Sequence, residues 1–295
     1  MLWIFATLIA AAAQTARNAM QSRLTSTLGT IGATQVRFLY GFPFALLFLG
    51  VVSAAAGAAP PAPNWTFLAF TSAGAMAQIA GTAALLAAMR ERSFSVATAF
   101  GKTEAVQVAL FGLIILGDDL TALRAAAIAI ATAGVFLIAV KPGERWDSAA
   151  LRPALLGVAS GGLYAIAAVG FRGGILALDE GVFFLRATTT LCWSLGLQAL
   201  MLGIWMAAFD RANLIKSAGL WRQSLFAGFM GAFASQFWFL GFSLTSAANV
   251  RTLGLVEVLF AQAVSRRLFG QAVALREVAG MVLIVGGVAL LLAAV

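Results

Sequence analysis

The sequence contains no histidine, and Cys192 is its only cysteine. The lack of histidine excludes histidine-based acid–base catalysis and removes the commonest metal ligand, so we expect no metal site. A single cysteine cannot form a disulfide within the chain. Charged residues make up only 10% of the sequence, whereas apolar residues make up 62%. A soluble chain with so little polar material could not cover its own surface.

The apolar residues come in blocks of about twenty, the length a helix needs to cross a bilayer. Only helices and closed barrels can span lipid, because every backbone polar group there must bond internally. The blocks lack the alternation of polar and apolar residues that barrel strands show. We therefore predict an all-α integral membrane protein with ten transmembrane helices. The blocks span residues 2–21, 34–54, 65–89, 95–117, 121–140, 153–172, 182–207, 221–243, 247–269 and 273–294.

The two halves of the sequence resemble each other. An offset of 153 residues places Glu104 on Glu257, and an offset of 149 places Arg37 on Arg186. The first offset also aligns Ser93 with Ser246, Gly101 with Gly254, Gly117 with Gly270, Gly134 with Gly287 and Val135 with Val288. We predict a first five-helix repeat at 1–140, a connecting loop at 141–152 and a second five-helix repeat at 153–295, around a central cavity. Because five is odd, the second repeat must be inverted.

The basic residues support the inversion. The connection between blocks 2 and 3 is uncharged, while its counterpart between blocks 7 and 8 carries Arg211, Lys216 and Arg222. Since positive loops stay in the cytoplasm, we expect a multi-pass protein of the cell (inner) membrane with both termini extracytoplasmic. The net charge of +8 is scattered at the helix ends, which argues against a nucleic-acid partner. The expected partners are the lipid bilayer and a small-molecule substrate.

Two short motifs point to a known family. The segments "TEAV…LGDD" and "VEVL…FGQA" repeat a glutamate followed by a glycine near the end of the same helix. With Arg37 and Arg186, they resemble the drug/metabolite transporter superfamily, specifically its EamA-type members. The family's prolines and second acid are replaced here by Ala105, Val258 and Gln271. The resemblance implies a ten-helix exporter of amino acids, including aromatic ones, and other small metabolites.

Polar and aromatic side chains within the blocks are candidates for a substrate cavity. Gln and Asn there either line a cavity for an amphipathic solute or form hydrogen bonds between helices, and the sequence leaves both open. Lys102 has no counterpart in the second half, so it either lines the pathway or extends its stem to an interface. The predicted substrate-binding residues are Gln14, Asn18, Gln78, Thr82, Phe100, Lys102, Tyr164, Gln236 and Trp238.

Glu104, Glu257, Arg37 and Arg186 are predicted as coupling or structural charges. Ionisable residues inside a membrane usually face the interior of the helix bundle. The glutamates either pair with Arg37, Arg186 or Arg251 to fix the packing, or bind substrate and carry a coupling proton. Their duplication favours the structural interpretation, because a fold element is inherited twice more readily than a substrate contact is used twice.

These patterns predict a secondary transporter that moves small organic metabolites, most of all amino acids, outward by alternating access. The alternatives are a channel or facilitator without coupling, or a non-transporting membrane scaffold. No Walker motif supports ATP drive. A membrane enzyme would need partners for Asp118–Asp119 or Asp179–Glu180 that the sequence lacks, so no enzyme activity, catalytic residue or cofactor is predicted. We expect a monomer or a weak dimer.

Overall fold

The structure is a computed structural model that describes residues 1–91, 100–139, 148–260, 263 and 274–294, without the side chains of 18–27, 30, 86, 89–91, 148–150 and 223. All regular elements of this described part are helical. Seven helices in it are long and apolar enough to cross a membrane, which makes the chain a multi-pass membrane protein. They span Ile31–Ala56, Trp65–Leu85, Ala122–Ala139, Leu151–Ala177, Phe183–Phe209, Ser224–Leu244 and Leu275–Ala293.

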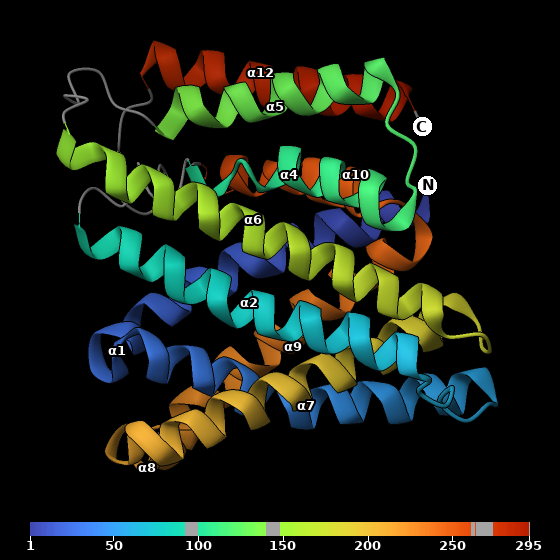
Figure 1. Ribbon diagram of the computed structural model, residues 1–295, viewed down its shortest axis with the longest axis vertical. Helices are drawn as coiled ribbons and strands as arrows, with labels where there is room; N and C mark the ends of the chain where they lie inside the picture. Colours follow the sequence, from blue (N-terminus) through green and yellow to red (C-terminus); the bar gives the residue numbers. More distant parts are fainter. Residues whose placement is uncertain (92–99, 140–147, 261–262, 264–273, 295) are drawn as a thin grey trace. The chain divides into compact units, whose positions relative to one another are not determined.

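Helix α1 (Leu2–Ala56) covers the first two predicted blocks and reverses direction at Gly29 (Figure 1). Gly29 has φ 65° and ψ −176°, a conformation that glycine adopts without steric cost. The reversal interrupts the helical hydrogen bonds, and the carbonyl of Leu28 instead accepts a hydrogen bond from Asn213 Nδ2 at 3.1 Å. Two apolar segments are therefore joined by one residue with no intervening loop.

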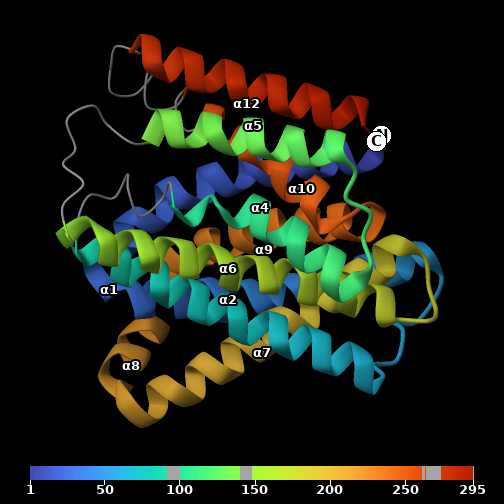
Figure 2. The same ribbon diagram turned by 45° about the horizontal axis from the view of Figure 1, so that its top comes forward.

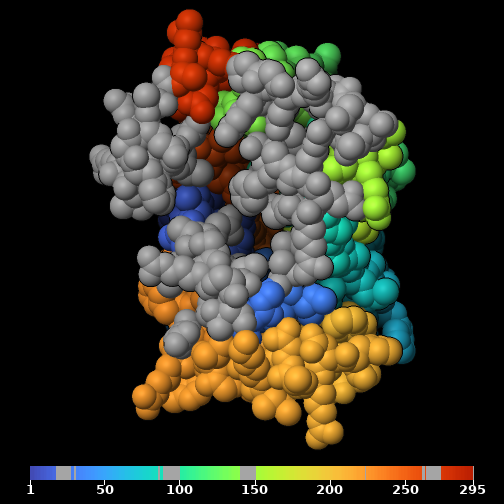
Figure 3. Space-filling model, turned by 90° about the vertical axis from the view of Figure 1, so that its left-hand side faces the viewer, coloured from blue at the N-terminus to red at the C-terminus, as the bar shows by residue number. Residues whose placement is uncertain are grey.

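The chain divides into two compact units, the first formed by Met1–Ile79 and Gly170–Thr245. In this unit α1 packs against α7 (Phe183–Phe209) and α9 (Trp221–Leu244). A short helix, α8 (Arg211–Gly219), connects α7 to α9, and its last residues accept hydrogen bonds from Tyr40 of α1. The side chains of α7 and α8 form a continuous surface, orange in Figure 3.

The second unit comprises Ala80–Val169 and Ser246–Val295. Helix α4 (Glu104–Phe111), which continues as a π-helical turn to Leu116, packs on α10 (Ala247–Leu253). Helices α5 (Ala122–Ala139) and α12 (Leu275–Ala293) lie side by side (Figures 1 and 2). Glycines make this contact close. A Cβ on Gly134 would lie 2.6 Å from the carbonyl oxygen of Gly280, and one on Gly287 would lie 2.6 Å from the Ala131 nitrogen.

Helices α2 (Trp65–Glu91) and α6 (Ser148–Ala177) each run through both units. In the first unit, Gly170 of α6 approaches α2 so closely that a Cβ there would lie 2.8 Å from the Phe70 carbonyl oxygen. In the second, Ser160 Oγ donates to the Gly81 carbonyl at 2.8 Å. Each compact unit thus contains segments from both sequence halves. The predicted division at 1–140, 141–152 and 153–295 concerns repeats rather than these units, and it stays a prediction.

Candidate functional site

Two helices of the second unit are interrupted at corresponding places. Before α4, Lys102 and Thr103 form a turn in which the Thr103 N–H donates to the Phe100 carbonyl at 3.2 Å. After α10, the residues Gly254–Val256 form a single 3₁₀ turn. The offset of 153 residues that relates the two sequence halves carries 101–103 onto 254–256. In transporters, interrupted helices at matching positions of two halves mark the site where substrate and ions bind.

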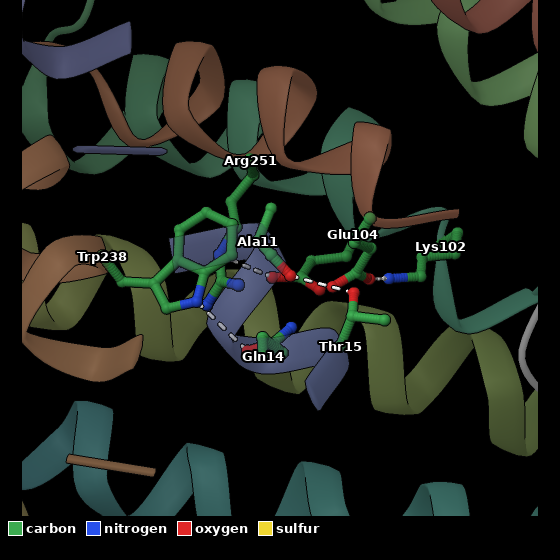
Figure 4. Close-up of polar contacts among 8 residues, drawn as sticks. Ala11, Gln14, Thr15, Lys102, Glu104, Trp238 and Arg251 are labelled. Carbon is green, nitrogen blue, oxygen red and sulfur yellow. Dashed lines mark hydrogen bonds and ion pairs between the residues drawn. The ribbon is translucent and has the colours of Figure 1, made fainter. Parts of the chain in front are cut away.

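A glutamate follows each interruption, and each glutamate pairs with a cation from the other interrupted helix. Lys102 Nζ contacts Glu257 Oε1. Arg251 Nε lies 3.0 Å from Glu104 Oε1 (Figure 4). The four side chains are between 12% and 22% exposed, so protein encloses most of each group. We call these contacts the crossed ion pairs. Together they hold two carboxylates and two cations with no net charge.

Helix α6 supports the interruption before α4 through a glycine. A Cβ on Gly161 would lie 2.8 Å from the Gly101 carbonyl oxygen, closer than real Cβ atoms approach backbone, and 3.1 Å from the Glu104 nitrogen, which is also tight. Gln107 Nε2 adds hydrogen bonds to the Val158 carbonyl of α6 at 3.1 Å and to Thr103 Oγ1 at 2.8 Å. The absence of a side chain at Gly161 therefore allows α6 to fix the backbone that carries Lys102 and Glu104.

In the first unit, the predicted cavity residues form hydrogen bonds between helices. Trp238 Nε1 donates to Gln14 Oε1 at 3.1 Å, which joins α9 to α1 (Figure 4). Two further pairs involve α7: Gln198 Nε2 donates to Gln78 Oε1 at 2.5 Å, and Gln236 Nε2 donates to Thr188 Oγ1 at 2.8 Å. The structure thus shows interhelical hydrogen bonds for Gln14, Gln78, Gln236 and Trp238, while a role in lining a cavity stays a prediction.

The remaining predicted residues of this kind belong to the second unit, apart from Asn18. The hydroxyls of Thr82 and Tyr164 share a hydrogen bond of 3.0 Å between α2 and α6. The ring of Phe100 meets that of Phe136 edge to face, with centroids 5.3 Å apart. Asn18 lies within α1, but its side chain is outside the described residues. Gly270 and Gln271 of the second family motif also lie outside them.

The arginines predicted as charge partners behave differently from one another. Arg251 pairs with Glu104, as one of the alternatives required. Arg186 of the first unit instead donates to the Leu178 carbonyl, just beyond the end of α6, at 3.3 Å. The Arg37 guanidinium lies 5.3 Å from the centroid of the Phe38 ring. A cation at the carboxyl end of a helix interacts favourably with the helix dipole, so the position of Arg186 supports a structural role.

Sequence reasoning missed two contacts. The pairing of Lys102 with Glu257 was not anticipated, because regular helical spacing gives no guide where the helix is interrupted. Arg172 was not singled out, yet its Nη1 donates to the carbonyls of Phe242 at 2.9 Å and Thr245 at 2.6 Å, at the end of α9. The balance of charge gave no signal for the first contact, since four cations and two acids lie within blocks 4 and 9.

The site offers ion pairing and hydrogen bonding. Within the described ranges, no three Asp, Glu or Cys side chains gather closely enough to hold a metal ion. Its carboxylates can accept hydrogen bonds from an ammonium group, while Lys102 and Arg251 can donate to a carboxylate. The arrangement is therefore suited to a small solute that carries both charges.

Comparison with known proteins agrees with the fold and the family resemblance. Residues 154–293 match the EamA-like transporter family. A solved structure titled "Crystal structure of protein" has a TM-score of 0.72 to this chain at 13% identity, covering 98% of this chain and 94% of its own, a likeness that shows the fold alone. A search of curated proteins gave no match. Residues 154–293 thus contain an EamA-like transporter family domain, which is consistent with the drug/metabolite transporter superfamily and indicates a membrane transporter of small molecules.

Proposed function

We propose that the protein is a secondary transporter that exports amino acids, including aromatic ones, or related amphipathic compounds across the inner membrane by alternating access. In this proposal ten transmembrane helices form two inverted five-helix repeats around a central cavity, with both termini extracytoplasmic. The observation that carries it is the pair of matching helix interruptions, at 102–103 and 254–256, joined by the crossed ion pairs.

The packing of α5 and α12 supports the inverted repeats. Gly134 of α5 and Gly287 of α12 are equivalent under the 153-residue offset. Gly134 contacts Gly280, whereas Gly287 contacts Ala127 and Ala131 earlier in α5. The contacts advance along one helix as they go back along the other, so the two helices are antiparallel. Equivalent helices of two inverted repeats must run in opposite directions, as these do.

The chemistry of the interrupted helices supports an amino-acid substrate. Glu104 and Glu257 can accept hydrogen bonds from an α-ammonium group, and Arg251 can hold an α-carboxylate in its planar fork of donors. A zwitterion offers an ammonium group to a carboxylate of the site and a carboxylate group to Arg251, so each of its charges meets a group of opposite charge.

Transport by the purified protein in vesicles tests the proposal. We expect radiolabelled L-phenylalanine to enter with saturable kinetics, and preloaded unlabelled L-phenylalanine to accelerate that entry. This counterflow distinguishes a carrier from a channel, because a carrier must return its site across the membrane. A panel of the other amino acids then defines the preference. Uptake that rises linearly with concentration and shows no counterflow, for every amino acid in the panel, would contradict the proposal.

A further inference from the structure

The two crossed ion pairs differ in one chemical respect. Glu104 pairs with an arginine, whose guanidinium stays protonated in proteins. Glu257 pairs with a lysine, whose ammonium can lose its proton when its surroundings change. Lys102 is one of only three lysines in the sequence and the only one in a predicted membrane block. The only lysine in a predicted membrane block therefore pairs with a carboxylate. In the other ion pair, the cation is an arginine.

We propose that Lys102 is the proton-exchange site that couples transport to a pH gradient, and that Arg251–Glu104 is the ion pair that stays charged throughout the cycle. This inference rests on the proposed function, to which it adds the energy source. The substrate class that it requires is one with an ammonium group, because such a group can take the place of the lysine at Glu257.

The coupling step involves one proton. In the empty carrier, Lys102 is an ammonium and Glu257 a carboxylate, held together as an ion pair. The substrate ammonium binds the Glu257 carboxylate and displaces Lys102. Without its counter-ion and close to a second cation, Lys102 breaks one Nζ–H bond and gives that proton to water, which leaves a neutral amine. When the substrate departs on the other side, the amine takes a proton from water there and pairs with Glu257 again. One substrate therefore exchanges for one proton.

The charged groups around Lys102 favour this step. On the elements that pack together here, the nearest charges are those of the crossed ion pairs themselves. Arg172 of α6 belongs to the first unit. The other described titratable groups on α5, α6, α12 and the connection after α4 lie at the helix ends: Asp118, Asp119, Arg124, Arg152, Arg276 and Glu277. Glu277 accepts a hydrogen bond from the Ala274 N–H and Arg124 donates to the Asp119 carbonyl, which accounts for both groups locally. Displacement from Glu257 thus removes the carboxylate that directly contacts the Lys102 ammonium.

Charge-conserving exchanges test the proposal with matched variants. Lys102→Arg and the control Arg276→Lys both keep every charge, but only the first removes a dissociable proton from the Lys102–Glu257 ion pair. Each variant is reconstituted and assayed with L-phenylalanine for uptake driven by a pH gradient and for counterflow without one. For one proton per substrate, wild type should accumulate L-phenylalanine up to about tenfold per pH unit. Arg276→Lys should retain this accumulation. Lys102→Arg should lose it while counterflow persists.

Several outcomes would overturn the proposal. Accumulation by Lys102→Arg at the wild-type level would show that the proton travels elsewhere. Counterflow by wild type without any effect of the pH gradient would remove the coupling yet leave the transporter function intact. Absence of both activities would count against the proposed function instead.

The protonation of Lys102 can also be measured without substrate. This measurement tests the proposal when neither transport activity is detected, or when a variant folds too poorly to transport. Reductive ¹³C-methylation makes lysine protonation visible by NMR, and the signal missing from Lys102→Arg identifies Lys102. In Glu257→Gln, which removes the counter-ion as substrate would, we expect this signal to titrate at lower pH than in wild type. A Lys102 signal with the same titration in both proteins would refute the mechanism.

Discussion

The two compact units differ in how their polar and charged side chains find bonding partners. In the first unit, amide, hydroxyl and indole groups bond across helices, as in Gln14–Trp238 and Gln198–Gln78, and Arg172 and Arg186 donate to backbone carbonyls at helix ends. In the second unit, carboxylates and cations pair with one another beside interrupted helices. None of the first-unit contacts just named pairs one charged side chain with another. In the second unit, each charged side chain of the crossed ion pairs depends on its oppositely charged partner.

The two units therefore differ in how much stability is lost when one contact is removed. A neutral hydrogen bond between membrane helices contributes little net stability, because its groups find other partners when it is lost. A buried ion whose partner is removed finds no other partner, and the resulting loss of stability is several-fold larger. The second unit should therefore respond strongly to single substitutions and weakly to matched double substitutions, whereas the first should respond weakly to both.

The largest effect is expected from removing one member of a crossed ion pair. Lys102→Met leaves Glu257 without its counter-ion, and Glu257→Gln does the same to Lys102. Each should lower the free energy of unfolding by about 3–5 kcal/mol. The double variant Lys102→Met/Glu257→Gln should lose far less than the sum, since it leaves no isolated charge. Reversible unfolding in detergent–lipid micelles measures all four proteins. Simple additivity in this cycle would show that the ion pair does not couple the two side chains.

An intermediate effect is expected at the glycine that supports the interruption before α4. In Gly161→Ala the new methyl group would overlap the Gly101 carbonyl oxygen, which is backbone and cannot turn away. We expect a loss of about 1–3 kcal/mol, the usual cost of overpacking a filled site. Gly286→Ala is the matched control, because no atom lies within 4 Å of the corresponding position in α12. Equal behaviour of the two variants would mean that α6 does not constrain α4 through Gly161.

The smallest effect is expected in the first unit. A double-mutant cycle of Gln78→Leu and Gln198→Leu should give a coupling energy of roughly 0.6 kcal/mol, and at most about 1.7 kcal/mol, the range known for hydrogen bonds between membrane helices. The same unfolding assay measures it. A coupling as large as that of the Lys102–Glu257 cycle would erase the contrast between the two units.

The sequence predicts the helical content and the membrane class well, because both depend on the length and composition of apolar blocks. The family resemblance also came from local motifs around Glu104 and Glu257, and the match of 154–293 agrees with it. The partner of Glu257 could not be predicted in the same way. Regular helical spacing treats residues 101–104 as one continuous helix, and the turn at Lys102 and Thr103 breaks that assumption.

The reversal of α1 was hidden from the sequence for a similar reason. Blocks 2–21 and 34–54 suggest two helices with a loop between them, but periodicity does not show that Gly29 alone makes the turn. Which polar residues bond to each other, such as Gln78 with Gln198, depends on how distant helices pack. Composition identifies such residues as candidates and leaves their partners undetermined.

The one-residue reversal at Gly29 also sets the rotational phase between the two arms of α1. With no slack chain to absorb a change, one amino acid inserted after Gly29 would turn every later side chain of the helix by about 100° around its axis. Gln35 would then point away from the Ala199 carbonyl to which it donates at 3.2 Å, and Tyr40 away from the carbonyls of α8. The chain length around this glycine is thus as tightly specified as the identity of the residues that it orients.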